Sequence, residues 1–412
     1  SLNLENSKFM GRNPRSLEIQ HVIDILPNNY TVTDKADGLR CFLSIFDNRV
    51  YLISTNLNIT YTGIELSKKL NKYNNTILDG EYMYLKKYDR YTFMVFDCLY
   101  KSNQPIIEEE SFFERLKHSE EVIENCFILG KQKGNKFKYF KGNYDENQIN
   151  KFYKKELINY FNNLNSDISI EKDKLLVRRK FFMPIIGGHD SEIFKGSSLL
   201  YDSCTLDNNI DMPYQIDGLI YHPINQKYSF TQRDSKFIEY KFKPPTQNSI
   251  DFYIKFKKDK DNNILKVYDN SNEDELKDKP YAICHLHVGK RFNDREIPTF
   301  FLDKEKLHIA YLFYDNKGKL KDIEGSILKD ETVVEFYYDT NSNISNNRCR
   351  WIPMRTRYDK TESVKRFGRK YGNYETTAIS VWRSIKNPFT ISNIRKLSDK
   401  SNFEKNINSL RK

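Results

Sequence analysis

The chain has 412 residues and a formal net charge of +11 at neutral pH. This length predicts one large domain or two to three ordinary domains, and the charge favours a polyanionic partner, such as RNA, DNA or nucleotide phosphates, over a basic surface without a partner. The six cysteines include no Cys-x-x-Cys pair, which argues against a zinc ribbon or a disulfide framework and favours a reducing, intracellular compartment.

Two further features concern the context of the chain. No apolar run reaches the length of a membrane span and no signal peptide is visible, so we expect no membrane partner. Because the chain begins with Ser1 and not with Met, we expect it to be an excised piece of a longer polypeptide.

The N-terminal part is predicted to form a helix and then a β region. Ser16 can cap a helix over residues 14–26, and strand-like segments follow at residues 30–33 and 41–46. The stretch from Thr33 to Arg40, Thr-Asp-Lys-Ala-Asp-Gly-Leu-Arg, links these segments and combines a candidate nucleophile, an acid and a glycine suited to a tight turn. By itself this pattern is more typical of an ordinary hairpin turn, so its interpretation depends on the segments downstream.

Two further strands carry carboxylates inside apolar runs. Residues 76–83 include Asp79 and Glu81, and residues 91–96 end at Asp97. Burial of a carboxylate is costly unless the group is paired or bound to a cation. These acids therefore indicate either a functional site or strand ends that meet solvent.

The middle of the chain is predicted to be partly helical and partly basic. Helices are expected over residues 111–126 and 146–164, and the helical spacing of apolar residues in the second indicates packing, not a cofactor site. Residues 131–141 mix lysine with aromatic residues; this is compatible with an RNA-contact patch and more often marks a solvated strand or hairpin. A strand over residues 175–186 has an Arg-Arg-Lys run at its centre.

Two strand-like segments further on carry charged residues. An apolar segment contains Asp217 followed by a glycine, and alternation over residues 237–243 places Lys241 and Lys243 on the same face of a strand. Two lysines on one face indicate a phosphate site; the alternative is an exposed edge strand protected by lysine. The Pro-Pro pair at residues 244–245 marks a candidate domain boundary.

Beyond residue 251 the chain is predicted to form a small β-barrel. Its short strands, separated by turn signals, are expected at residues 252–256, 281–287, 299–301, 308–314 and 332–338. The Cys-His-x-His cluster at residues 284–287 has no second ligand pair nearby, which favours packing over zinc. After a basic run at residues 351–360, a helix is expected at 374–385, and the polar residues 398–412 indicate a linker or tail.

In this order, the segments resemble the covalent nucleotidyltransferase superfamily and, within it, the messenger-RNA capping guanylyltransferases. The matching motifs are Lys-x-Asp-Gly-x-Arg at Lys35 to Arg40, Asp-Gly-Glu at Asp79 to Glu81, Phe-Asp at Phe96 and Asp97, Asp-Gly-Leu-Ile at Asp217 to Ile220, Lys-x-Lys-Pro with Asn-x-Ile-Asp at Lys241 to Asp251, and Arg-x-Arg-x-Asp-Lys at Arg355 to Lys360. One motif would be weak, whereas this ordered set, within residues 9–390, is specific. The later residues Lys370 to Asn373 and Trp382 are similar to capping enzymes of large cytoplasmic DNA viruses or related linear plasmids.

The resemblance implies an α+β fold class. It predicts a nucleotidyltransferase domain at residues 1–245, with ATP-grasp-like antiparallel sheets and flanking helices, followed by an OB-fold β-barrel at residues 246–360. Residues 361–412 are expected to form a C-terminal helix and tail, linking to a further domain.

The resemblance also implies an activity. The Lys35 amine, once deprotonated, would attack the α-phosphorus of GTP, release pyrophosphate and carry GMP as a lysyl phosphoramide, until the 5′-diphosphate end of RNA takes the GMP. Neighbouring lysines, desolvation or a divalent cation would favour the deprotonated amine, and the cation, Mg or Mn, would also offset charge on the phosphoryl oxygens. We expect the RNA triphosphatase and guanine-N7 methyltransferase modules on the same polypeptide or on a partner. A cytoplasmic location, in a viral factory or virion, is expected for a viral enzyme of this kind.

Site residues follow from the motif matches. The family's catalytic roles fall on Lys35, Asp217, Lys241 and Lys243. Its nucleotide-binding roles fall on Ala36, Arg40, Glu81, Phe96, Asp251, Arg355, Asp359 and Lys360, and its metal-binding roles on Asp217 and Glu81. By this analogy, Arg40 and Glu81 hold the ribose and Phe96 stacks on guanine, while the barrel residues reach the β- and γ-phosphates when the barrel closes over the nucleotide.

The chain departs from the family pattern in two places. The wide separation of Asp97 and Asp217 requires an insertion, expected to hold the helix at residues 146–164. Many relatives have an arginine where this chain has Ser54-Thr55, so RNA-end binding is expected to use other residues, such as Arg178 or Arg179.

Two other functions are compatible with the motifs. An ATP-dependent RNA or DNA ligase shares Lys35, Glu81, Asp217, Lys241 and the barrel, and a non-catalytic RNA-end binding module could keep the fold without the activity. The Asn-x-Ile-Asp run after Lys243 and the presence of Ala36 favour capping over ligation. The intact set of charged motif residues favours an enzyme over a binding module.

Overall fold

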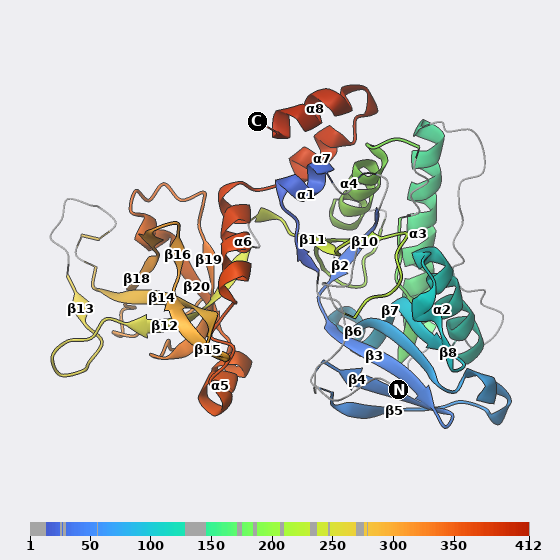
Figure 1. The fold of residues 1–412 in the computed structure, drawn as a ribbon, viewed down its shortest axis with the longest axis horizontal. Coiled ribbons are helices and arrows are strands. Elements are labelled where there is room, and N and C mark those ends of the chain that lie inside the picture. The colour runs from blue at the N-terminus through green and yellow to red at the C-terminus, as the bar shows by residue number, and fades with distance from the viewer. Residues whose placement is uncertain are drawn as a thin grey trace. The chain divides into compact units, whose positions relative to one another are not determined.

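The computed structural model describes residues 14–24, 27, 30–55, 57–127, 146–170, 175–183, 188–206, 210–230, 237–245, 248–268, 276–277 and 279–411. The chain divides into two compact units (Figure 1). Unit 1 comprises Ser1–Lys243 and Thr390–Lys412, and unit 2 comprises Pro244–Phe389. Unit 2 is therefore an insertion in unit 1 and is joined to it at both ends.

A four-stranded sheet in unit 1 carries Lys35, the first residue of the Lys-x-Asp-Gly-x-Arg motif, whose last residue, Arg40, is on β3 (Leu39–Phe46) of the second sheet. Its order is β1 (Arg15–Ser16), β11 (Tyr240–Phe242), β10 (Ile216–Pro223) and β2 (Tyr30–Ala36). The neighbours of β10 run antiparallel to it, and β1 runs parallel to β11. Lys35, Asp217 and Lys241 thus lie on three neighbouring strands.

A seven-stranded sheet in unit 1 carries the two carboxylate motifs. Its order is β5 (Ile59–Glu65), β4 (Arg49–Ser54), β3 (Leu39–Phe46), β6 (Thr76–Leu85), β7 (Arg90–Lys101) and β8 (Gln104–Pro105), with β9 (Leu176–Arg179) parallel to β7. The β3–β4 hairpin turns at Asp47 and Asn48, whose φ angles of 48° and 56° suit the left-handed positions of a type I′ turn. Apolar residues alternate along these strands, so one face forms a hydrophobic core against α2 (Phe112–Cys126).

The other helices of unit 1 are α1 (Ile19–Asp24), α3 (Glu146–Ile170), α4 (Glu192–Thr205), α7 (Ile391–Leu397) and α8 (Phe403–Leu410), with short 3₁₀ turns η1 (Lys68–Tyr73), η2 (Lys86–Tyr88), η3 (Ile106–Glu108) and η6 (Lys400–Asn402). The predicted packing helix is confirmed by α3, in which Leu157 and Phe161 are fully buried. The predicted helix over residues 14–26 is only partly correct, because β1 occupies its first turn.

The C-terminal segment differs most from its prediction. Residues 398–411, expected to be a polar linker or tail, contain η6 and α8. Phe403 and Ile407 of α8 are buried, and Arg395 of α7 forms an ion pair of 2.7 Å with Asp202 of α4. Figure 1 shows α7 and α8 beside α4. A few apolar residues at helical spacing are therefore enough to anchor these short helices to unit 1.

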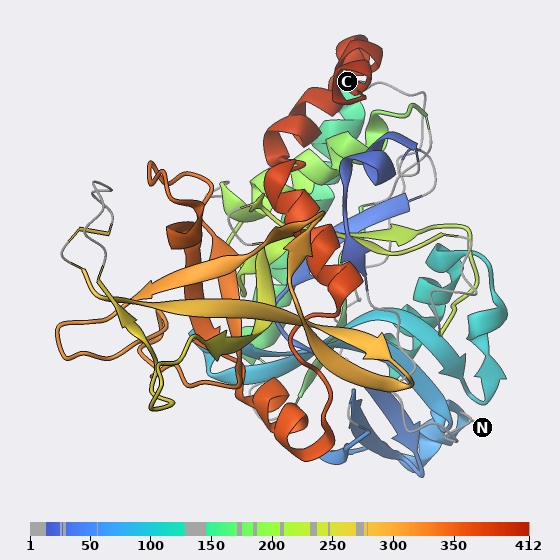
Figure 2. The same ribbon diagram turned by 60° about the vertical axis from the view of Figure 1, so that its left-hand side comes forward.

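Unit 2 is built on a curled antiparallel sheet. Its order is β13 (Lys266–Val267), β14 (Tyr281–Phe292), β12 (Ser249–Phe256), β19 (Thr332–Tyr338) and β20 (Trp351–Thr356), with β15 (Arg295–Phe300) and β18 (Ile309–Phe313) also paired to β14. The small hairpin of β16 (Leu302–Asp303) and β17 (Lys306–Leu307) joins β15 to β18. Because β19 returns to lie beside β12, the chain follows the Greek-key order of the five-stranded, partly open OB-fold barrel. Figures 1 and 2 show the curled form of the sheet from two sides.

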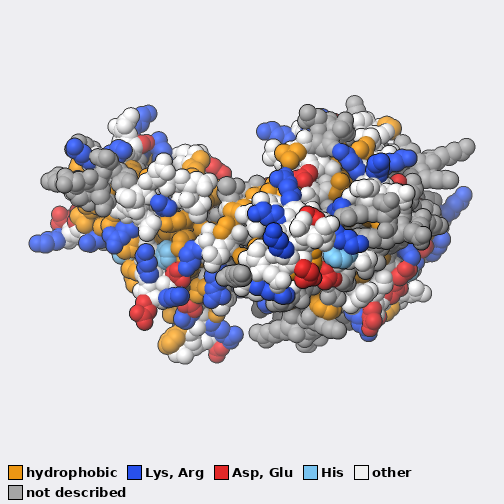
Figure 3. Space-filling view, turned by 90° about the horizontal axis from the view of Figure 1, so that it is seen from above, with side chains coloured by type: hydrophobic (Ala, Val, Ile, Leu, Met, Phe, Trp, Pro, Cys, Tyr) orange, Lys and Arg blue, Asp and Glu red, His pale blue; other side chains and the backbone are white. Residues whose placement is uncertain are grey.

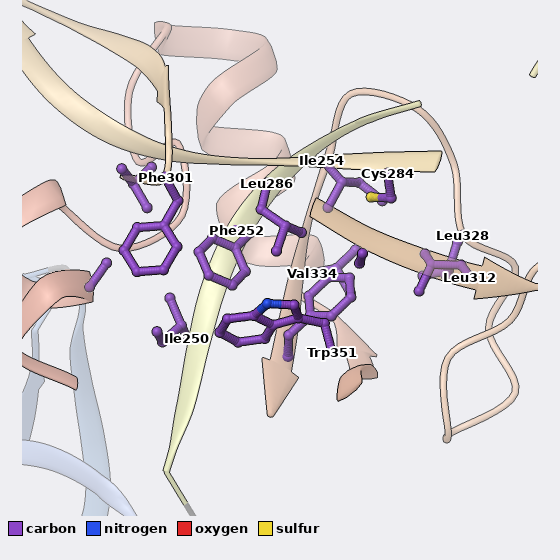
Figure 4. Close-up of a cluster of buried hydrophobic side chains, with 14 of the residues drawn as sticks. Ile250, Phe252, Ile254, Cys284, Leu286, Phe301, Leu312, Leu328, Val334 and Trp351 are labelled. Carbon is purple, nitrogen blue, oxygen red and sulfur yellow. The ribbon is translucent and has the colours of Figure 1, made fainter. Parts of the chain in front are cut away.

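Alternating residues of these strands form the core of unit 2. Ile250, Phe252 and Ile254 of β12 are fully buried, and Figure 4 shows them together with inward-pointing side chains of the other strands. Phe252 and Trp351 meet edge to face, with ring centroids 5.3 Å apart. The core of unit 2 is thus independent of unit 1, as a separate domain requires.

Two helices complete unit 2. The basic run before residue 360 leads from β20 into α5 (Tyr358–Phe367), and the predicted helix near residues 374–385 is α6 (Glu375–Lys386). The turn η5 (Asn347–Arg350) precedes β20. Trp382 of α6 packs on Trp351 with 5.4 Å between the ring centroids. Helix α6 therefore closes the barrel core from one side.

The structure supports packing, not zinc binding, at residues 284–287. Cys284 is fully buried in the core, while His285 and His287, one and three positions further, belong to the other face of β14. Across the described part of the chain, no group of three or more His, Cys, Asp or Glu side chains is arranged to hold a metal ion. Among the same residues, no helix is long and apolar enough to cross a membrane.

Candidate active site

Lys35 stands out on a buried strand. It is the one residue of β2 that is not buried, and its Nζ lies 3.0 Å from Oδ2 of Asp217, 182 residues further along the chain. Both side chains are partly accessible, with 20% and 33% of their surface exposed. The lysine is thus held by its strand while its amine remains open to a ligand.

A β-bulge brings Asp217 to the lysine. In the pairing of β10 with β2, residues 217 and 218 stand opposite Lys35 alone, which is the two-against-one geometry of a bulge. Gly218 has a φ of +137°, and a Cβ atom there would lie 2.0 Å from the carbonyl oxygen of Phe242. The glycine of the Asp-Gly motif is therefore required by the close approach of β11 and by the backbone conformation.

Two further amines lie close to the Lys35 side chain and its partner. Lys243 Nζ lies 3.9 Å from Asp217 Oδ2, and Lys241 is on β11, opposite Ile220 of β10. Burial, together with the charges of Lys243 and Lys35, lowers the pKa of Lys241 from 10.5 to about 8. Within the described residues the Lys241 amine has no ion-pair partner. Lys35, Lys241 and Lys243 together carry more positive charge than Asp217 can balance, so this lysine group is suited to bind an anion such as a phosphate.

The glycine of the Lys-x-Asp-Gly motif has a different role from the one predicted. Gly38 was expected to permit a tight turn, but it does not adopt a positive φ. A Cβ atom at this position would lie 2.7 Å from Cγ of Glu81 and 2.8 Å from the carbonyl oxygen of Tyr82. Gly38 therefore allows the lysine segment to pack directly against β6, the strand that carries Glu81.

Glu81 lies within the electrostatic field of the lysine group. Burial raises the pKa of its carboxyl group, while the charges of Lys180, Lys35 and Arg40 oppose that shift. Arg40 and Glu81 are directly opposite each other in the pairing of β3 with β6. The structure thus brings Lys35, Arg40 and Glu81 of the predicted set together, with Ala36 next to the lysine on β2.

Lys180 is a buried residue of this region that the sequence analysis missed. Its Nζ lies 3.2 Å from Oδ2 of Asp34 and also donates a hydrogen bond to the Asp34 carbonyl oxygen. It therefore holds the backbone immediately before Lys35, and its charge acts on Glu81. The available signal was its place at the end of the Arg-Arg-Lys run in an apolar strand.

Arg40 is fixed by a buried carboxylate. Its Nη2 and Nε lie 2.6 and 3.1 Å from the two oxygens of Asp79, and the hydroxyl of Tyr228 donates to Asp79 at 2.6 Å. The Arg40 guanidinium also lies 5.2 Å from the ring centroid of Phe96. Asp79 is thus committed to positioning Arg40, and Tyr228 is a further member of this network that the motif matches do not include.

Asp97 has a structural partner of its own. Its carboxylate receives the Nε and Nη2 of Arg115 at 2.9 and 3.1 Å, and both side chains are completely buried. Arg115 also donates to the carbonyl oxygens of Glu109 and Gln226. This carboxylate is therefore satisfied within the fold, and its pair with Arg115 ties the middle of β7, next to Phe96, to α2. The strand expected to end at Asp97 continues to Lys101.

Unit 2 holds a second group of predicted residues. Asp251 of β12 accepts hydrogen bonds from Arg357 Nη1 at 2.9 Å and from Lys360 Nζ at 2.5 Å. Arg355 pairs with Glu335 of β19 at 2.7 Å. Asp359 is 68% exposed at its side chain and accepts from Arg357. The basic run of unit 2 is thus held in place by carboxylates of two barrel strands.

Two suggestions for RNA contacts have different outcomes. Arg178 and Arg179 were expected to serve RNA-end binding, but both are buried and form ion pairs of 2.7 Å with Asp167 and 2.6 Å with Glu120. They are therefore unsuitable as surface contacts. The patch at residues 131–141 lies outside the described residues. The surface charge itself is spread widely, and Figure 3 shows Lys and Arg side chains on both units on the face that it draws.

The carboxylates of unit 1 could provide only part of a cation site. Asp217 and Glu81 were the expected metal ligands, and the described residues contain no cluster of three or more candidate ligand side chains. Mg²⁺ in phosphate-transferring enzymes is commonly held by one or two carboxylates together with substrate phosphates and water. The two side chains fit a cation that arrives with a nucleotide, because among the described residues Asp217 is bonded through Oδ2 alone and Glu81 forms no ion pair.

The α+β unit with a lysine motif, followed by an OB-fold barrel, is the architecture expected of the covalent nucleotidyltransferase class. Two family descriptions match the chain in succession: the catalytic domain of mRNA capping enzyme at residues 1–195 and the C-terminal domain of mRNA capping enzyme at residues 247–394. The chain belongs to the mRNA capping enzyme family.

Curated relatives agree with this family. The chain is 37% identical to a probable mRNA-capping enzyme of Acanthamoeba polyphaga mimivirus over 98% of its own length and 34% of that protein. It is 22% identical to the mRNA-capping enzyme of African swine fever virus (isolate Warthog/Namibia/Wart80/1980), over 90% of this chain and 36% of that protein. Both relatives are viral, as the motif flank suggested. The chain spans about a third of the length of these relatives.

A solved structure of mycobacterial DNA ligase D complexed with ATP and MES has a TM-score of 0.40 and 12% identity to this chain. The likeness covers 86% of this chain and 96% of that one. A likeness at this level supports no inference about function.

Proposed function

We propose that this chain is the guanylyltransferase part of an mRNA capping enzyme. It would transfer GMP from GTP to the 5′-diphosphate end of RNA through a covalent lysyl-N-GMP intermediate. The observation that carries the proposal is the accessible Lys35 amine, 3.0 Å from Asp217 on a neighbouring strand, in a chain of the capping enzyme family. We also propose a nucleotidyltransferase domain at residues 1–245, an OB-fold domain at 246–360 and a C-terminal part at 361–412.

In the first step, the neutral Lys35 amine would attack the α-phosphorus of GTP. A bond forms between nitrogen and phosphorus, the bond to the bridging oxygen breaks, and pyrophosphate leaves with the electron pair of that bond. Asp217 would orient the amine through its 3.0 Å contact. The phosphoramide keeps GMP activated until a terminal oxygen of the RNA diphosphate displaces Lys35.

The other amines of the group would hold the phosphate. Lys241 is on β11 and Lys243 follows its last residue, and burial of Lys241 strengthens its interaction with an anion. On the opposite sheet, Arg40 and Glu81 would hold the ribose, and Phe96 would stack on guanine. The Asp79 carboxylate, which grips Arg40 at 2.6 Å, would keep the guanidinium in one orientation before the nucleotide binds.

The residues of unit 2 would act on the triphosphate. Arg355, Asp359 and Lys360, with Asp251 behind them, would contact the β- and γ-phosphates when the barrel closes over the bound GTP, which would also exclude water. A divalent cation, Mg or Mn, would bind with the nucleotide at Asp217 and Glu81 and offset negative charge on its phosphates.

Partners and location are also proposals. Because the viral relatives are about three times longer than this chain, we propose that triphosphatase and N7-methyltransferase modules lie elsewhere in the same polypeptide or on a partner. We propose a cytoplasmic location, in a viral factory or virion, for the whole enzyme.

The test is to trap the covalent intermediate. The chain is incubated with GTP or ATP labelled at the α-phosphate, with Mg²⁺ or Mn²⁺, and the labelled residue is mapped by peptide mass spectrometry. We expect an acid-labile GMP adduct on Lys35, absent in Lys35→Arg and unchanged in Lys69→Ala, a lysine on the exposed surface of unit 1. Labelling by ATP alone would instead indicate a ligase, and no labelling by either nucleotide would leave only an RNA-end binding module.

A further inference from the structure

The end of helix α5 and the turn after it carry positive charge that the proposed chemistry does not use. Residues 355–371 contain seven Lys or Arg residues and two carboxylates. Among the later ones, Arg366 is paired with Glu362 at 2.6 Å. Lys365, Arg369 and Lys370 are exposed and have no ion-pair partner within the described residues. We refer to residues 365–371 as the basic turn.

An exposed aromatic ring lies among these charges. Phe367, the last residue of α5, is 63% exposed. The guanidinium of Arg369 lies 5.0 Å from the centroid of its ring, so the ring and the cation form one surface. An aromatic face beside several unpaired cations is the combination with which proteins bind single-stranded nucleic acid, because bases stack on the ring and phosphates meet the charges.

The basic turn is anchored to the barrel. Helix α5 ends at Gly368, whose φ of 58° is left-handed and whose N–H bonds to the carbonyl oxygen of Val364. The carboxylate of Glu296, on β15, accepts the backbone N–H groups of Lys370 and Tyr371 at 2.9 and 2.8 Å. The charges are thus presented by a fixed backbone, which reduces the ordering cost of binding.

The ring of Tyr371 provides a second anchor. It packs edge-on against Tyr253 of β12, with 5.1 Å between the ring centroids. Two residues later, Asn373 exchanges hydrogen bonds with the backbone of Asp251, its side chain accepting at 2.8 Å and its N–H donating at 2.7 Å. Asp251 is also the partner of Lys360. The basic turn is therefore anchored to β12, the strand whose Asp251 also holds Lys360.

We propose that the basic turn binds the single-stranded RNA acceptor a few nucleotides away from its 5′ end. This inference rests on the proposed function. Helix α5 has ten residues and is about 15 Å long, so its two ends are separated by the length of a short RNA segment. Lys360 in its first turn would act at the triphosphate end, while the basic turn holds the strand further along. Acceptors of only two nucleotides would be too short to reach it.

The test compares a charge variant, a stacking variant and a matched control. The charge variant combines Lys365→Gln, Arg369→Gln and Lys370→Gln, and the stacking variant is Phe367→Ala. The control combines Lys306→Gln, Lys317→Gln and Lys319→Gln. These replace three exposed lysines of unit 2 and so remove the same amount of charge as the charge variant. Each protein is assayed for GMP adduct formation, for binding of a long 5′-diphosphate single strand at several salt concentrations, and for GMP transfer to that strand and to a dinucleotide acceptor.

We expect all variants to form the GMP adduct at the rate of the unmodified chain. The charge variant should bind the long strand at least about tenfold more weakly, and the slope of log affinity against log salt should fall by about 2, since each phosphate contact on a single strand contributes about 0.7. Phe367→Ala should weaken binding by about tenfold, as expected for loss of one stacked base, with less effect on the salt slope. The control should behave as the unmodified chain, and transfer to the dinucleotide should be unchanged throughout.

The inference is overturned if the charge variant keeps the affinity and salt slope of the unmodified chain, or if the control weakens binding equally. It is also overturned if duplex RNA, or polyglutamate at equal charge, displaces the labelled strand as well as unlabelled single-stranded RNA does. Absence of the GMP adduct in the unmodified chain would refute the proposed function, and with it this inference. Normal adduct formation with unaltered RNA binding would refute the inference alone.

Discussion

Replacement of Lys241 by methionine should stabilise unit 1 while impairing GMP transfer. The pKa of this lysine falls from 10.5 to about 8, first because of burial and then because of the charges of Lys243 and Lys35. A pKa shift of this size means that the folded protein disfavours the protonated amine by about 3 kcal/mol at neutral pH. Methionine has a similar length and no charge, so Lys241→Met should recover up to that amount.

The sign of the pH dependence follows from proton linkage. Between pH 8 and 10.5 the unfolded chain binds the Lys241 proton more tightly than the folded chain does, so the stability of the unmodified protein should rise with pH across this window. Below pH 8 both states carry the proton and the full penalty is present. The stability advantage of Lys241→Met should therefore be largest at pH 7 and should decrease toward pH 10.

The chain offers an internal control for this measurement. Both of its tryptophans, Trp351 and Trp382, lie in unit 2, so tryptophan fluorescence follows unit 2 alone, while far-UV circular dichroism follows both units. Urea unfolding should show a shift of the circular dichroism transition with no shift in fluorescence. An unchanged or lowered stability of unit 1 at pH 7, or an advantage that grows with pH, would refute the electrostatic reasoning.

Three other changes test the two groups of site residues. Asp217→Asn removes the carboxylate 3.0 Å from the Lys35 amine and should slow GMP adduct formation by about a hundredfold or more, measured as the single-turnover rate with labelled GTP. Tyr228→Phe removes the hydroxyl that bonds Asp79 at 2.6 Å and should raise the KM for GTP by roughly tenfold, measured in the same assay with GTP and 2′-deoxy-GTP. Asp251→Asn removes the negative charge shared by Lys360 and Arg357, of which Arg357 keeps Asp359 as a partner. It should destabilise unit 2 by about 2 kcal/mol, less than for a fully buried pair because the cations are partly exposed, measured by tryptophan fluorescence in urea.

Each of these changes has an outcome that contradicts its reasoning. Unaltered single-turnover rates in Asp217→Asn would remove that carboxylate from the mechanism. For Tyr228→Phe, a fall in kcat with unchanged KM would mean that the hydroxyl does not act through nucleotide binding. If Asp251→Asn shifts the circular dichroism transition of unit 1 and leaves fluorescence unchanged, then Asp251 does not stabilise unit 2 through its ion pairs.

Several features of the site could be predicted because they depend on short-range sequence patterns. The two-residue period of a strand indicated that Lys241 and Lys243 act together, and the charge of Lys243 does lower the pKa of Lys241, although β11 ends at Phe242; helical spacing predicted the packing of α3. The glycines after Lys35 and Asp217 were noticed correctly but explained incompletely. At Gly38 the constraint comes from contact with β6, which is distant in sequence, and no local pattern contains that information.

Other features escaped prediction because burial depends on what packs around a residue. The Arg-Arg-Lys run has the composition of a surface patch, yet Arg178 and Arg179 are buried against acids from α3 and α2. The last of the three, Lys180, bonds to the backbone immediately before Lys35. Charge alone gave no sign of this, because a buried cation and a solvated one are the same residue in a sequence.

By itself, the sequence determined the class of chemistry: an ordered series of lysine, acid and glycine motifs, alternating apolar strands and an excess of positive charge that suits a phosphate-bearing substrate. Only the tertiary structure decided which groups meet. It set the bulge that brings Asp217 to Lys35, the buried network behind Arg40 and the return of the last two helices to unit 1. Each of these features depends on contacts between segments that are far apart in the chain. Whether a charged group is stabilised by its partners more than burial costs it is decided only when those segments pack together.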